Sequence, residues 1–178
     1  MTNRRKEEIL EILKRVSGND KDIDTIVDVV KLAIANGFFV CRLKEGTSIN
    51  GMMIVSNNNS KNTPNKIIAF QPNLSEKDNR FIIAHELGHY FLHFSQSTNT
   101  DNYQFVYSYH GNKQKMVEEE EADFFATNLL VPEQLFIKKN EELGNLKETK
   151  FGIDYLSNFF RVNKKCIEKR YSEIYAQQ

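Results

Sequence analysis

The chain has 178 residues, enough for one compact domain with a sizeable core, and we expect a single domain over residues 1–178. Hydrophobic residues make up 40% of the chain, a globular composition rather than a disordered one. Lys plus Arg and Asp plus Glu number 24 each, so no net field attracts nucleic acid or an anionic membrane, and every apolar run is far too short to span a bilayer.

The cysteines and the N-terminus favour a cytoplasmic location. Cys41 and Cys166 are far apart and fit no metal-binding or redox spacing, which predicts two unpaired thiols. Residues 1–15 include basic side chains, but no apolar signal core follows them. We therefore expect a cytoplasmic protein.

The first 36 residues predict two helices. Residues 4–16 place Ile9, Ile12, Leu13 and Val16 at helical spacing. A second helix is expected from about residue 22 to residue 35. Its inward face would consist of five apolar residues: Ile23, Ile26, Val27, Val30 and Ile34.

A small sheet and a helical second half follow. Strands are predicted at 38–43, 49–55 and 66–71, and they should form a mixed sheet that is antiparallel in part. Helices are expected at about 75–93 and 116–131 and through most of 132–178, with turns at Gly144 and Gly152, whereas the polar stretch 95–114 predicts a long loop. The fold class is therefore α+β.

The motif with the clearest chemistry is HELGH, at residues 85–89 within the predicted helix 75–93. Residues four apart lie on one face of a helix, so His85 and His89 can bind one zinc ion through bonds of about 2 Å. Glu86 would lie beside the ion, where its carboxylate can accept a proton from a metal-bound water. Gly88 adds no side chain between the ligands, so a neighbouring backbone or a substrate can come close.

A catalytic zinc ion needs a third protein ligand. The metzincin pattern is excluded, because Leu92 and Ser95 stand where that pattern requires glycine and histidine. His93 is one helical turn beyond His89 and too far along the axis to share an ion easily with His85. We therefore expect His93 to have a structural or supporting role.

The helix predicted at 116–131 offers four consecutive glutamates, Glu118 to Glu121. Its buried face is marked by four apolar residues: Ala122, Phe125, Ala126 and Leu129. Glu118 and Glu119 flank that face, whereas Glu120 and Glu121 should point away from it. Asp123 follows Glu119 by four residues, so one carboxylate can bind the metal while the other orients a histidine. Glu119 is the preferred third ligand, with Glu118 as the alternative.

Two segments resemble the ImmA/IrrE family of metallopeptidases: RFIIAHELGHYFLH at 80–93 and ExxADxFAxxLLxP at 119–132. The HExxH…ExxxD arrangement is also similar to that of thermolysin-like gluzincins. The resemblance implies a zincin-like domain with one zinc ion, held by His85, His89 and Glu119, and with Glu86 as the base. The family often has asparagine where this chain has Asp123, a change that brings the site nearer to the gluzincin pattern.

The resemblance also implies a target. Members of the family typically cleave a helix-turn-helix transcriptional repressor, often one encoded nearby on a phage or other mobile element. We therefore expect a site-specific endopeptidase that acts as an anti-repressor. The alternative is a metal-containing regulatory or sensor module with little proteolytic turnover; an intact Glu86 favours the peptidase, because a binding module has no need of a base.

The 95–114 loop and the C-terminal residues lead to two further predictions. Three residues of the 95–114 loop could donate a hydrogen bond to the oxyanion: Tyr107, Tyr109 and His110. Residues 156–171 predict two helices joined by a tight turn that Asn163 caps. We interpret this hairpin as packed rather than DNA-binding, because the chain is neutral, and we expect neither nucleic acid nor a membrane as a partner.

Overall fold

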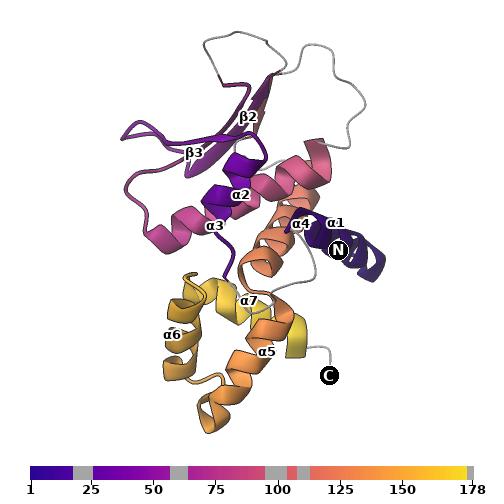
Figure 1. Ribbon diagram of the computed structural model, residues 1–178, viewed down its shortest axis with the longest axis vertical. Coiled ribbons are helices and arrows are strands. Elements are labelled where there is room, and N and C mark those ends of the chain that lie inside the picture. The colour runs from indigo at the N-terminus through magenta and orange to yellow at the C-terminus, as the bar shows by residue number, and fades with distance from the viewer. Residues whose placement is uncertain (18–25, 57–63, 95–103, 108–112, 176–178) are drawn as a thin grey trace.

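The computed structural model describes residues 1–17, 26–56, 64–94, 104–107 and 113–175 (Figure 1). The first half contains α1 (Asn3–Val16), α2 (Val29–Ala35), β1 (Phe39–Arg42), β2 (Gly51–Ser56), β3 (Lys66–Phe70) and α3 (Glu76–His89). A π-helical turn (Tyr90–Phe94) continues α3, and β4 (Gln104–Tyr107), α4 (Lys113–Leu130) and α5 (Glu133–Glu142) follow. A 3-10 turn (Gly144–Leu146), α6 (Lys150–Phe159) and α7 (Lys164–Tyr175) complete the described chain. The predicted α+β class is confirmed.

The sheet has four strands in the order β1-β3-β2-β4. β1 is parallel to β3, whereas β2 is antiparallel to both β3 and β4. The predicted mixed sheet is therefore confirmed, but the prediction that 95–114 is loop throughout is wrong. β4 forms because residues 104–107 pair with β2, with Tyr107 opposite Met53. Phe105, Val106 and Tyr107 favour a strand, but this run is short and lies within a polar stretch, so its pairing with β2 was not predicted.

The two N-terminal helices differ in how well the sequence predicted them. α1 begins behind Thr2, whose side chain accepts a hydrogen bond from the Arg5 amide, and it extends almost as predicted. α2 begins only at Val29, because the Asp28 side chain caps it by accepting from the Lys31 amide.

The buried face of α2 is also shifted by one residue from the prediction. Val29 and Ala33 are buried, whereas Val30 and Ile34, which were expected to point inward, are exposed. Ile26 and Val27 precede the helix, and Ile23 lies outside the described residues.

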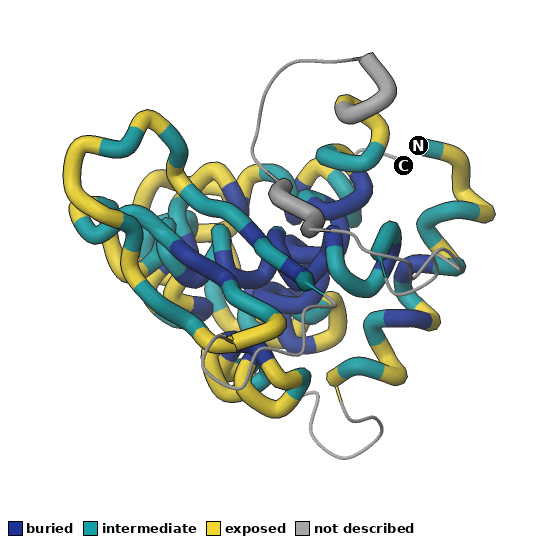
Figure 2. The backbone as a smooth tube through the Cα atoms, turned by 90° about the horizontal axis from the view of Figure 1, so that it is seen from above, coloured by how far each residue is buried: buried dark blue, intermediate teal, exposed yellow. Residues whose placement is uncertain are grey.

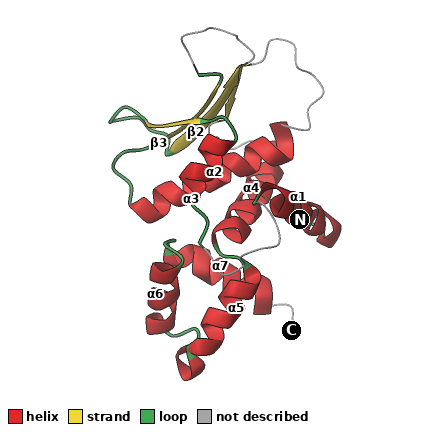
Figure 3. Ribbon diagram, viewed as in Figure 1, coloured by secondary structure: helices red, strands yellow, loops and turns green. Residues whose placement is uncertain are grey.

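α3 and α4 form the centre of the molecule, with the sheet on one side and α5–α7 on the other (Figures 1 and 3). Ser75 caps α3 by accepting a hydrogen bond from the Asp78 amide. One buried apolar cluster connects the ends of the chain, from Ile9 in α1 to Ile167 in α7 (Figure 2). A single domain over 1–178 remains a prediction.

The C-terminal part is helical, as predicted. Asn163 caps α7, because its side-chain oxygen accepts a hydrogen bond from the Cys166 amide at 2.9 Å. The turn expected at Gly152 is wrong, since this residue lies inside α6. No helix within the described ranges is both long and apolar enough to cross a membrane.

Candidate metal centre

α3 and α4 bring together the three residues that the sequence proposed as metal ligands. His85 Nε2 lies 3.1 Å from Glu119 Oε2, and His89 Nε2 lies 3.3 Å from Glu119 Oε1. The two Nε2 atoms are 3.0 Å apart. Ligand atoms about 2 Å from a tetrahedral zinc ion are separated by about 3.3 Å. The spacing of His85, His89 and Glu119 therefore fits one metal ion.

A glycine permits the close helix packing that this spacing requires. A Cβ atom placed on Gly88 would lie 3.1 Å from both the Cα and the carbonyl oxygen of Ala122. Any larger residue would therefore press against the backbone of α4, one turn from Glu119. The close approach expected at this position is confirmed: it is the backbone of α4 that fills the space.

Asp123 contacts His85 on the outer side of the group. Its Oδ1 lies 2.9 Å from His85 Nδ1, so the Nδ1–H can donate to the carboxylate and leave Nε2 facing the other ligands. Asp123 Oδ2 lies 3.6 Å from Lys169 Nζ in α7. The position of Lys169 beside Asp123 could not be predicted from the sequence, because nothing local indicates that α7 packs beside α4.

The charges at the site favour a bound cation. Burial lowers the pKa of His85, but hydrogen bonds with Asp123 and Glu119 outweigh this effect and raise the pKa to about 9. Burial opposes ionisation of Glu119, yet its hydrogen bonds with the two histidines lower its pKa to about 2. Burial lowers the pKa of His89 to about 4. Carboxylates that stabilise a positive imidazolium would equally stabilise a metal ion, and the neutral His89 is already in the form that binds one.

Glu86 lies next to this group in a dry environment. The residue is 6% exposed, and its Oε2 has no hydrogen-bond partner in the part of the chain that the structure describes. Burial raises the pKa of Glu86 to about 7, a value that suits a group exchanging protons near neutral pH. Gly51 of β2 lies close by, since a Cβ there would be 3.4 Å from Glu86 Oε1.

The neighbouring glutamates have other surroundings. Glu120 is exposed, as expected, but the prediction that Glu121 points away from the buried face of α4 is wrong. Glu121 is buried and forms an ion pair of 2.7 Å with Arg5 of α1. Glu118, the alternative ligand, is not part of the His85–His89–Glu119 group, and its carbonyl oxygen lies 3.3 Å from His93 Nε2. His93 likewise is not part of this group.

The proposed oxyanion donors remain predictions. Tyr107 ends β4, and the structure describes its backbone alone. Tyr109 and His110 lie outside the described residues.

An α+β fold with an HExxH helix, and with a glutamate from a second helix beside the two histidines, defines a metallopeptidase-like protein. Residues 46–172 match the family described as the IrrE N-terminal-like domain, Peptidase_M78. Since this match covers well over half of the chain, the protein belongs to that family, and the resemblance seen in the sequence is confirmed. No curated protein matches the chain. α1, α2 and β1 precede the matched residues.

Proposed function

We propose that the protein is a zinc-dependent endopeptidase with His85, His89 and Glu119 as zinc ligands and Glu86 as the general base. Membership of a peptidase family supports the reaction class. The observation that carries the proposal is the convergence of two imidazole nitrogens and a carboxylate within 4.8 Å of one another, beside a buried glutamate. Two imidazoles with one carboxylate are a donor set typical of catalytic zinc.

Each residue of the site has a distinct task in this mechanism. A bound zinc ion would supply Lewis acidity and lower the pKa of a water molecule to about 7. Glu86 would accept one proton of the water as the water oxygen bonds to the scissile carbonyl carbon, and it would pass that proton to the amine nitrogen as the C–N bond breaks. Asp123 holds the ring of His85 in place through Nδ1.

We further propose that the substrate is a helix-turn-helix repressor encoded near this gene, so that the protein acts as an anti-repressor. Selectivity would come from docking, because one cleft around a metal ion cannot distinguish a single target among cellular proteins. Exposed aromatic side chains in α6, Phe151 and Tyr155, support a docking role for the C-terminal helices. We propose residues 95–114 as the other part of this docking surface, and they lie mostly outside the described residues. The cytoplasmic location stays a prediction.

The test is a cleavage assay in which the purified protein and the neighbouring repressor are mixed with zinc. We expect one or two defined fragments of the repressor, and no cut with a chelator or with Glu86→Gln. Glu120→Gln is the matched control, since Glu120 is exposed and the change is chemically the same. Casein should be cut slowly or not at all.

Two results would contradict the proposal. An intact repressor at stoichiometric enzyme, together with rapid loss of casein, would indicate a peptidase of broad specificity. A protein that binds zinc and the repressor but cuts neither substrate would indicate the alternative, a regulatory binding module.

A further inference from the structure

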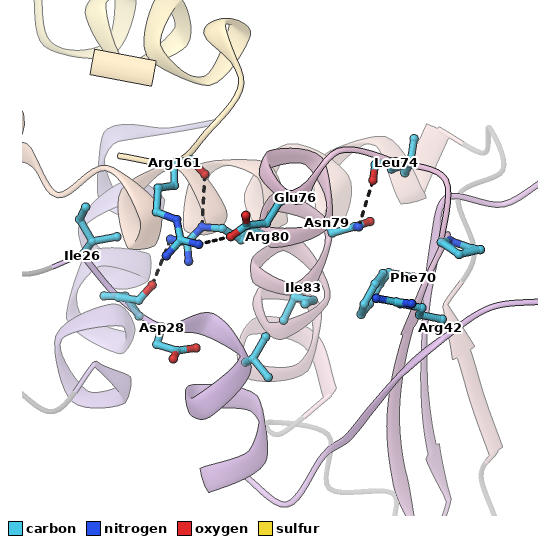
Figure 4. Close-up of a pocket in the computed structure, with 13 residues that line it drawn as sticks. Ile26, Asp28, Arg42, Phe70, Leu74, Glu76, Asn79, Arg80, Ile83 and Arg161 are labelled. Carbon is cyan, nitrogen blue, oxygen red and sulfur yellow. Dashed lines mark hydrogen bonds and ion pairs between the residues drawn. The ribbon is translucent and has the colours of Figure 1, made fainter. Parts of the chain in front are cut away.

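A pocket of about 530 Å³ lies on a different face of α3 from the metal centre. Its walls come from the start of α2, the ends of β1 and β3, the start of α3 and the turn between α6 and α7 (Figure 4). Arg80 and Ile83 line it from α3, whereas His85 and His89 project from another face of the same helix towards α4. This volume is within the range of sites that hold small organic molecules.

The wall of this pocket contains a buried cation that lacks an acidic partner. Arg80 is 8% exposed, and its Nε and Nη2 donate hydrogen bonds to the carbonyl oxygens of Arg161, at 3.2 Å, and Val27, at 3.1 Å. Within the described chain, no carboxylate lies at ion-pair distance from its guanidinium. Burial and the charge of Arg161 lower the pKa of Arg80, and the charges of Asp28 and Glu76 offset this only in part. A buried charge without a counter-charge is costly, so this position favours an anion.

The acids around the pocket are already engaged. Glu76 forms an ion pair with Arg161. Asp28 caps α2, accepting from the Lys31 amide at 3.1 Å, and its other oxygen lies 3.5 Å from Lys31 Nζ. Neither carboxylate is thus available as a close partner for Arg80.

A second arginine without a partner lies across the pocket. Arg42, at the end of β1, is exposed, and its guanidinium forms no hydrogen bond or ion pair in the part of the chain that the structure covers. Figure 4 shows Arg80 and Arg161 at one end of the pocket and Arg42 beside Phe70 at the other, with Ile83 between them. The pocket therefore combines cationic ends with an apolar middle.

We propose that this pocket binds a small organic anion, with a carboxylate, phosphate or sulfonate group on an apolar body. Guanidinium groups bind such anions through paired hydrogen bonds, and Phe70 and Ile83 would contact the apolar body. A purely structural role for Arg80, as a link between two carbonyl groups, explains neither the unpartnered Arg42 nor the apolar cavity between the two arginines.

Fluorescence titration of the full chain with anilinonaphthalene sulfonate tests the proposal, and N-phenylnaphthylamine, the same aromatic body without the sulfonate, serves as the uncharged probe. We expect one sulfonate probe per chain and much weaker binding of the uncharged probe. Arg42→Gln and Arg80→Gln should each lower the affinity for the sulfonate probe by about tenfold or more, which is the loss expected when a charge-assisted hydrogen bond is removed. Lys44→Gln, which removes the same charge two residues from Arg42 and outside the pocket lining, should leave binding unchanged.

The two arginine variants protect the test against misfolding. If Arg80→Gln lowers the melting temperature severely, the result for Arg42→Gln decides the test, because the Arg42 side chain is exposed and forms no hydrogen bond or ion pair with the described residues. Unchanged affinity in a folded Arg42→Gln variant would overturn the proposal, as would equal binding of the charged and uncharged probes. The readout involves neither zinc nor peptide cleavage, so its failure would leave the proposed peptidase activity untouched.

Discussion

Replacing Gly88 by alanine tests whether close packing of α3 on α4 sets the metal site. The new Cβ would lie 3.1 Å from the Cα and the carbonyl oxygen of Ala122 and 3.3 Å from the Cβ of Phe125. Alanine is favoured over glycine in a helix by about 1 kcal/mol, whereas overpacking a buried contact costs about 1–3 kcal/mol. The contacted atoms belong largely to the backbone of a buried helix and cannot rotate away. We therefore expect a net loss of about 1 kcal/mol, because the two helices must move apart.

Urea unfolding and zinc titration against a competing chelator measure the two consequences of Gly88→Ala. The free energy of unfolding should fall by about 1 kcal/mol, which corresponds to a melting temperature lower by about 2–4 °C. Zinc affinity should fall as well, because Glu119 is on α4 and both histidines are on α3. A variant that is about 1 kcal/mol more stable than the parent, as helix propensity alone would give, and that binds zinc normally would refute this reasoning.

Three further predictions concern single side chains. Glu121→Gln should lower the free energy of unfolding by about 1–3 kcal/mol, because it breaks a largely buried ion pair with α1. Glu120→Gln, at an exposed position, should change this free energy little, and equal effects of the two variants in urea unfolding would contradict the burial of Glu121. Asp123→Ala should weaken zinc binding by about 10–100-fold in a chelator competition, and unchanged affinity would mean that the carboxylate orients no ligand. Burial raises the pKa of Cys166 to about 12, so a maleimide at pH 8 should label the less buried Cys41 first, and rapid labelling of native Cys166 would be inconsistent with that burial.

The grouping of His85, His89 and Glu119 is the part of the protein that the sequence indicated best, because its geometry is mostly local. The i, i+4 spacing places His85 and His89 on one face of a helix, whatever surrounds that helix. The apolar period of α4 left Glu118 and Glu119 as candidates, and the position of Asp123 four residues after Glu119 favoured Glu119. Only the meeting of the two helices is long-range, and the family resemblance implied it.

The misplaced features all depend on partners distant in sequence. Glu121 is a carboxylate that periodicity places outside, but Arg5, more than a hundred residues earlier, makes its burial favourable. α2 is only seven residues long, so its own pattern did not determine which face contacts α3. β4 pairs with β2 from a distant part of the sequence, and its short Phe-Val-Tyr run did not indicate that partner.

Zinc content measured by elemental analysis tests the central claim most directly. After exposure to zinc and desalting, the protein should retain about one zinc ion per chain, as should the Glu120→Ala control, whereas Glu119→Ala should lose most of it, because the change removes one of the three ligands. No retained transition metal in the parent protein, or full retention by Glu119→Ala, would contradict the assignment of His85, His89 and Glu119 as the metal site.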